Sequence, residues 1–163
     1  MAFVSLGWTY PDANTGIAGR PAKGNIAGAR RGAVCRLAAL AVAIGSAALQ
    51  RALALASAYL EHWERNHGVL LLRNQAADRG DKVFLKLRKQ ALEPLIDKLT
   101  ALIAESQHQG RVAADLHPYL AASALVSILE KLSAYAQSLR HFNATREDLI
   151  HTCARIINTT VTG

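Results

Sequence analysis

The residues that could bind a metal ion are few and poorly spaced. His62 and His67 form the closest histidine pair, but a five-residue spacing places them about 140° apart on a helix, which is too far for a shared metal ion. Cys35 and Cys153 are too distant in sequence to match the spacing of a zinc site or a redox pair. The sequence therefore predicts no metal site and no cofactor.

No arrangement of residues indicates catalysis either. Gly45-Ser46 lacks the second glycine of a nucleophile elbow, and no Asp and His partners for it are recognisable. Gly19-Arg20-Pro21 resembles the core of a minor-groove AT-hook, but Ala18 stands where a second arginine belongs. The glycines near Lys23 do not form a phosphate-binding loop, because no Gly-Lys-Ser/Thr sequence follows. We predict that the protein is not an enzyme and has no catalytic residues.

The formal charge of +7 is concentrated in the first third of the chain. Residues 1–57 contain six bases and one acid, whereas the remainder contains 13 bases and 11 acids. Residues 1–32 also hold six of the eleven glycines and two of the four prolines, so they cannot bury enough surface to offset the entropy of ordering. We predict a disordered basic tail over residues 1–35.

An apolar run of 13 residues, from Leu37 to Leu49, follows this tail. It is shorter than the roughly 20 residues that span a bilayer, so no membrane segment is expected. With Arg30-Arg31 ahead of it, the run resembles the apolar core of a twin-arginine export signal, although the sequence after Arg31 departs from the expected pattern. A buried Ala-rich helix is the alternative interpretation, and two distant cysteines favour a reducing cytoplasm.

Apolar residues recur at helical spacing from Ala48 to the end of the chain. A composition of 51% hydrophobic but only 6% aromatic residues favours helices over strands. We predict an all-α fold for the domain at residues 36–163. The helices are expected at about 48–80, at 81–110 with a kink or break at Pro94, at 118–142, and at 146–161 after an N-cap at Thr145.

The last two of these helices each carry two apolar stripes. A helix that is apolar over most of its girth needs two packing partners, and a chain this small has too little protein left to cover the second stripes. We therefore predict a homodimer, formed through an isologous four-helix contact. The predicted interface residues are Ala121, Leu125, Ile128, Leu132, Leu149, Cys153, Ile156 and Ile157.

Several segments resemble, in order, the landmarks of the effector-binding domain of tetracycline-repressor (TetR) family transcription regulators. The first is Tyr59–His67 followed by Leu70-Leu71-Leu72; the later ones are Leu102–Gln107 with Gly110, Asp115–Ala122, and the helix that contains Asp148-Leu149-Ile150. The resemblance covers residues 48–163. It implies an antiparallel helical bundle whose last two long helices pair in a homodimer.

The resemblance also implies a pocket for a small, largely apolar effector. Such pockets use a few convergent polar groups to fix the orientation of the ligand, while Trp63 and Phe84 fit a purely structural role in the core equally well. The residues expected to line the pocket are Trp63, Asn66, His67, Leu70, Phe84, Leu87, Leu95 and Leu99.

The sequence departs from the family at its other end. TetR-family regulators place a three-helix DNA-binding unit ahead of this domain, and residues 1–47 do not match one. We expect a cytoplasmic, sensing and dimerising part of a regulator that binds DNA only weakly and without sequence preference. The alternatives are a small exported helical protein and a basic-tailed, non-specific nucleic-acid binder.

Overall fold

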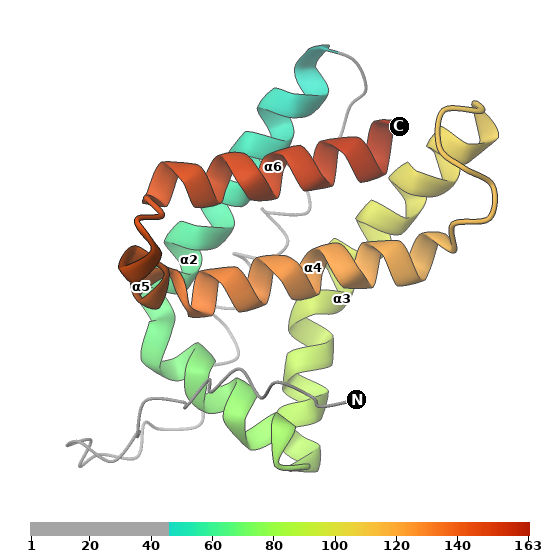
Figure 1. Ribbon diagram of the computed structural model, residues 1–163. Helices are drawn as coiled ribbons and strands as arrows, with labels where there is room; N and C mark the ends of the chain where they lie inside the picture. The colour runs from blue at the N-terminus through green and yellow to red at the C-terminus, as the bar shows by residue number, and fades with distance from the viewer. Residues whose placement is uncertain (1–45) are drawn as a thin grey trace, which may run out of the picture.

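The computed structural model describes residues 46–163, and over this range the chain forms helices and no strand. The first two helices form an antiparallel hairpin, and two further helices lie across one side of it (Figure 1). In chain order the elements are α2 (Ser46–Asp78), α3 (Lys82–His108), α4 (Pro118–Ala134), α5 (Ala136–Leu139), the 3₁₀ turn η1 (Arg140–Phe142) and α6 (Arg146–Thr162). The predicted all-α fold is confirmed.

The predicted helix ends agree with local hydrogen bonding. The Asp81 carboxylate caps α3 by accepting from the backbone N–H groups of Val83 at 2.9 Å and Phe84 at 3.3 Å. Gly80, between α2 and α3, has a φ of 85°, which is the left-handed conformation that glycine adopts without strain. Thr145 and Asp148 form the expected capping box at the start of α6.

One prediction within the helices was wrong, and another is narrowed. α3 continues through Pro94, so the structure excludes a break there and leaves the predicted kink as the remaining alternative. The helix predicted over 118–142 ends at Ala134 instead, because Tyr135 has non-helical angles (φ −105°, ψ 10°). The chain must reverse here so that α6 can pack back across α2, and α5, η1 and the left-handed Asn143 (φ 57°) complete the turn.

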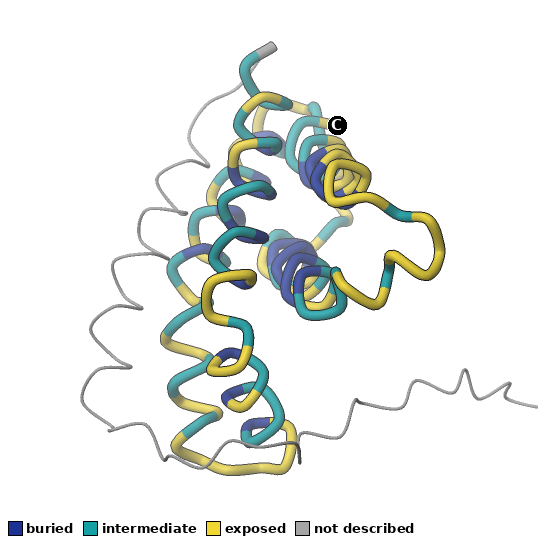
Figure 2. Tube along the Cα trace, turned by 90° about the vertical axis from the view of Figure 1, so that its left-hand side faces the viewer, coloured by how far each residue is buried: buried dark blue, intermediate teal, exposed yellow. Residues whose placement is uncertain are grey.

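The core lies between the hairpin and the α4–α6 layer. α6 packs mainly on α2, and α4 packs mainly on α3, so the buried sides of all four helices face one interior (Figure 2). Each fully buried Leu or Ile contributes about 1.5–3 kcal/mol relative to an exposed one. The largest fully buried apolar side chains are Trp63, Leu55, Leu60, Leu70, Leu95, Leu99, Ile103, Leu129 and Val126.

The predicted tail at 1–35 and most of the apolar run at 37–49 lie outside the described residues. Residues 46–49 of that run form the first turn of α2. None of the helices described here is long and apolar enough to cross a membrane.

Candidate functional site

A bend in α2 sets the geometry of the site. Asn66 has non-helical angles (φ −123°, ψ 19°) in the middle of the helix, and its amide nitrogen donates to the His62 carbonyl at 2.9 Å. Asn competes for backbone hydrogen bonds in this way, and Gly68 follows two residues later, so the local sequence disfavours a straight helix. The bend divides α2 into two segments, before and after Asn66.

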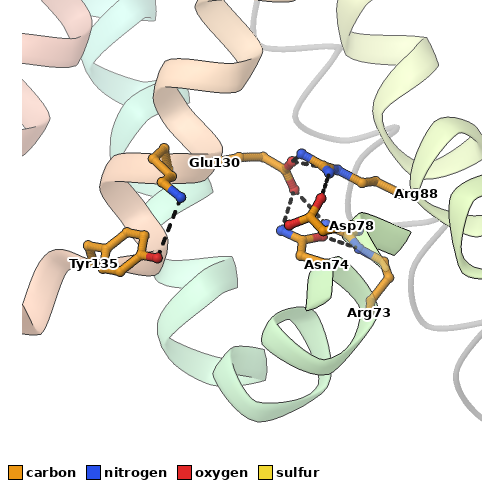
Figure 3. A network of polar contacts seen from close by, with 7 residues as sticks. Arg73, Asn74, Asp78, Arg88, Glu130 and Tyr135 are labelled. Carbon is orange, nitrogen blue, oxygen red and sulfur yellow. Dashed lines mark hydrogen bonds and ion pairs between the residues drawn. The ribbon is translucent and has the colours of Figure 1, made fainter. Parts of the chain in front are cut away.

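Beyond the bend, a carboxylate is buried between two arginines. Glu130, on α4, has a side chain that is only 4% exposed. Its Oε1 accepts from Arg73 Nη2 of α2 at 2.5 Å, and its Oε2 accepts from Arg88 Nε and Nη2 of α3 at 3.1 and 3.0 Å. Asn74 accepts from Arg73 Nε at 2.9 Å. This network ties three helices together at one point (Figure 3).

One member of the network is exposed to solvent. Asp78, the last residue of α2, accepts from Arg88 Nη1 at 3.0 Å, and its side chain is 54% exposed. A buried ion pair is held strongly once formed, whereas an exposed one contributes little. The link between Arg88 and Asp78 is therefore the weakest ion pair of the network.

Tyr59 lies in the interior near this network. Burial raises the pKa of its phenol far above the usual range, and the negative charge of Glu130 raises that pKa further. Tyr59 therefore remains a neutral hydroxyl under physiological conditions. Burial likewise raises the pKa of the Cys153 thiol, to about 11, so this cysteine is protonated and unreactive at neutral pH.

A cavity of about 250 Å³ opens beside the network, between α2, α3 and α4. One part of its wall carries Glu130, Arg88 and Asp78. Another carries Lys131, whose Nζ lies 4.7 Å from the ring centroid of Tyr135 and 3.4 Å from its hydroxyl. The lining residues are Trp63, Leu71, Asn74, Gln75, Asp78, Arg88, Ser127, Glu130, Lys131, Ala134 and Tyr135. Most of these residues are polar or charged, while the accessible surface of the wall is mostly apolar.

A comparison with protein families matched residues 35–163 to the family described as "Tetracyclin repressor-like, C-terminal domain". The chain belongs to this family. Neither the search of curated proteins nor the search of solved structures gave a match. Membership indicates a TetR-like, ligand-responsive transcription regulator, from a family that is generally non-enzymatic. The suspected TetR resemblance is confirmed.

No single cavity described among residues 46–163 is lined by all of the residues predicted to form a TetR-type effector pocket. Trp63 lines the cavity beside the charged network. His67 packs edge-on against Trp63, with ring centroids 6.1 Å apart, but lines a different cavity next to the start of α6. Leu99 lines a space of only about 30 Å³ between α2, α3 and α6.

The other predicted pocket residues are placed away from the cavity beside the network. Leu70 and Leu95 are fully buried in the core. Asn66 is exposed at the bend, while Phe84 and Leu87 are half-buried in the first half of α3. None of these five lines that cavity.

The charged members of the site were missed in the sequence. Glu130 and Lys131 are the only charged residues of α4, a helix that is otherwise apolar or small. A single acid in such a helix is the signal that could have indicated a buried, paired carboxylate. Its partners Arg73 and Arg88 lie 57 and 42 residues away in sequence, so spacing alone could not identify them.

The predicted dimer residues divide into buried and outward-facing positions. Leu125 and Ile157, which were predicted at the interface, are buried in the core of the single chain. Ala121, Leu149 and Cys153 are also buried. The residues that remain at least partly accessible are Ile128, Leu132 and Ile156.

No cluster of three or more potential metal ligands occurs among residues 46–163. His62 and His67 belong to the bend of α2, where the side chain of Asn66 lies 3.4 Å from His62 Nδ1. His62 therefore contributes both its backbone carbonyl and a ring contact to the bend at Asn66.

Proposed function

We propose that this chain is the effector-sensing and homodimerising domain of a TetR-like transcription regulator, and that the cavity beside the Glu130 network receives the effector. The observation that carries this proposal is the cavity's position. Its wall contains Asp78, Arg88 and Glu130, whose ion pairs join α2, α3 and α4. A ligand there contacts all three helices at once, so its binding energy can shift their relative positions.

The test is a thermal-shift screen of small molecules with the full chain, because a ligand that binds only the folded state raises Tm. Hits are then measured against Gln75→Phe, which places a ring in the cavity. Gln90→Phe is the matched control, since Gln90 is exposed on α3 and lies outside the cavity. We expect Gln75→Phe to abolish the shift and Gln90→Phe to retain it. A ligand that stabilises both variants equally would place the effector elsewhere.

Homodimerisation through α4 and α6 is the second part of the proposal. Both helices lie on the same side of the hairpin (Figure 1), and their outward side carries Leu120, Ile128 and Ile156. Leu120 is 63% exposed and Ile156 is 36% exposed in the single chain. Ala124 and Thr152, which are small and also exposed, allow close approach of a second copy. A standard interface buries about 800 Å² on each partner.

Two neighbouring substitutions separate dimerisation from folding. Ile156→Asp places a charge on the outward face and should give folded monomers, because a charge in a dry interface costs several kcal/mol. Ile157→Asp places the same charge at a position that is 5% exposed in the core, and should unfold the chain. Sedimentation and circular dichroism distinguish the two outcomes. A well-folded wild-type monomer at tens of micromolar would contradict the dimer.

We also propose a cytoplasmic protein whose basic N-terminal residues give weak, salt-sensitive DNA binding without sequence preference. Six of the seven charged side chains in residues 1–57 are basic. Binding to unrelated DNA duplexes should be equally weak and should fall steeply with salt. Nanomolar, sequence-selective binding at physiological salt would contradict this part. Neither export nor dedicated nucleic-acid binding is favoured by a feature of the described residues.

A further inference from the structure

Resting on the proposed effector cavity, we infer that the effector is a small organic anion, a carboxylate on a compact apolar body. Three cations border the cavity or its network, Arg73, Arg88 and Lys131, against two carboxylates, Glu130 and Asp78. The described residues of the site therefore carry an excess of one positive charge. A bound monoanion neutralises it, whereas a bound cation doubles it.

Arg88 is the group that receives the carboxylate. Its Nε and Nη2 remain on Glu130, which Arg73 also holds in the interior. Its Nη1 donates to Asp78, the exposed partner of the network. A ligand carboxylate can take the place of Asp78 at Nη1 without exposing Glu130, so the exchange breaks only the most exposed ion pair of the network and forms a charge-assisted hydrogen bond.

Lys131 supplies the second positive charge at the cavity wall. Its ammonium group lies over the ring of Tyr135, at 4.7 Å from the centroid. A face of the Tyr135 ring that could attract a cationic ligand is therefore already used by a cation of the protein. This arrangement favours an anion over a cation in the same cavity.

The size and apolar part of the cavity limit the rest of the ligand. A volume of about 250 Å³ is below the usual range of drug-sized sites, which begins at about 300 Å³. Trp63, Leu71 and Ala134 provide an apolar surface within it. A single ring or a short branched chain attached to the carboxylate satisfies both conditions.

Benzoate, benzamide and benzamidine test the charge directly, because they share one ring and carry a negative, no and a positive charge. Each is added at about 20 mM and constant ionic strength to the full chain, since small ligands of this kind bind weakly. We expect benzoate to raise Tm by about 2–5 °C and the other two to have smaller effects. The shift should disappear in Gln75→Phe and persist in Gln90→Phe.

Two charge variants then assign the contacts. Lys131→Gln should weaken benzoate binding about fivefold, because it removes one cation from the cavity wall. Asp78→Asn should strengthen it about threefold, because it removes the carboxylate that competes for Arg88. A purely structural role for Asp78 would not increase affinity. Lys86→Gln and Asp97→Asn are the matched controls, since both residues are exposed on α3 outside the cavity and should change affinity less than twofold.

The outcomes separate this inference from the proposed site. Benzamide or benzamidine could raise Tm as much as benzoate does, and this shift could be lost in Gln75→Phe. That result would contradict an anionic effector but would still support the cavity as the binding site. No benzoate shift, or one that is unaffected by Lys131→Gln and Asp78→Asn, also overturns the anion. The proposal that this cavity is the effector site is contradicted if ligands found by the broad screen still bind Gln75→Phe.

Discussion

The two ends of the α2–α3 hairpin are stabilised differently. At the apolar end, where α2 begins, apolar side chains pack under α6. At the charged end, where α2 turns into α3, the hairpin is held mainly by ion pairs. Leu55, Leu99 and Ile157 meet at the first end, around a space of only about 30 Å³. At the second end, α3 has no buried side chain before Leu95, while Val83 and Leu85 are 65% and 46% exposed.

This difference suggests that the two ends of the hairpin differ in how easily they can move. The apolar end has almost no free volume, so any displacement there loses dispersion contacts and is resisted. The charged end holds a larger cavity and few buried apolar contacts, which are the features of a segment of low local stability. Ligand-responsive elements are drawn from such segments, and this supports the effector site at the charged end.

The largest expected effect comes from removing the central carboxylate. Glu130→Gln leaves Arg73 buried without its ionic partner, which should lower the free energy of unfolding by about 3–5 kcal/mol. Glu93→Gln is the control, because Glu93 forms an exposed pair with Lys89 at 3.8 Å, worth about 0–1 kcal/mol. Urea denaturation measures both. Equal small losses would show that the network does not hold the charged end together.

The apolar end should respond to loss of packing. Leu99→Ala removes a side chain that is 1% exposed and should cost about 2–5 kcal/mol. Leu85→Ala, at 46% exposure on the same helix, should cost less than about 1 kcal/mol. Denaturation midpoints at unchanged m-value report the two costs. Similar values for the two substitutions would contradict the division of α3 into a packed and a loosely packed half.

The helices were predictable from sequence, whereas the charged network that joins them was not. Helical periodicity and capping residues such as Asp81 and Thr145 act within a few residues, so they gave the order and most boundaries of the helices. The Glu130 network depends on which charged residues the packed helices bring together, and this is a tertiary property. Its position also depends on the bend at Asn66, where a single polar side chain outweighs a long helical pattern.

Hydrogen exchange compares the two halves of α3 within one helix. Amides of residues 82–92 should exchange at least about tenfold faster than those of residues 95–106, because only the second half carries buried side chains. A bound effector should slow exchange in the first half and leave the second half unchanged. Uniform protection along α3, with or without ligand, would mean that the helix opens as one unit.

The smallest effect is expected at the capping box of α6, where a carboxylate has hydrogen bonds like those of Glu130 but faces water. Hydrogen bonds from the Thr145 hydroxyl and backbone N–H, at 2.6 and 2.9 Å, lower the pKa of Asp148 below its ordinary 3.8. A lowered folded-state pKa adds stability that is complete above the unfolded value and is lost as pH falls through the folded one. Asp148→Asn should therefore lower Tm slightly at about pH 7, and the difference from wild type should shrink in acid and vanish once Asp148 is protonated in the folded protein. Thermal melts of both proteins across this range measure it. A loss of Tm that persists in acid, or one as large as the loss caused by Glu130→Gln, would contradict this prediction. It would mean that solvent exposure does not make the Asp148 carboxylate less important for stability than that of Glu130.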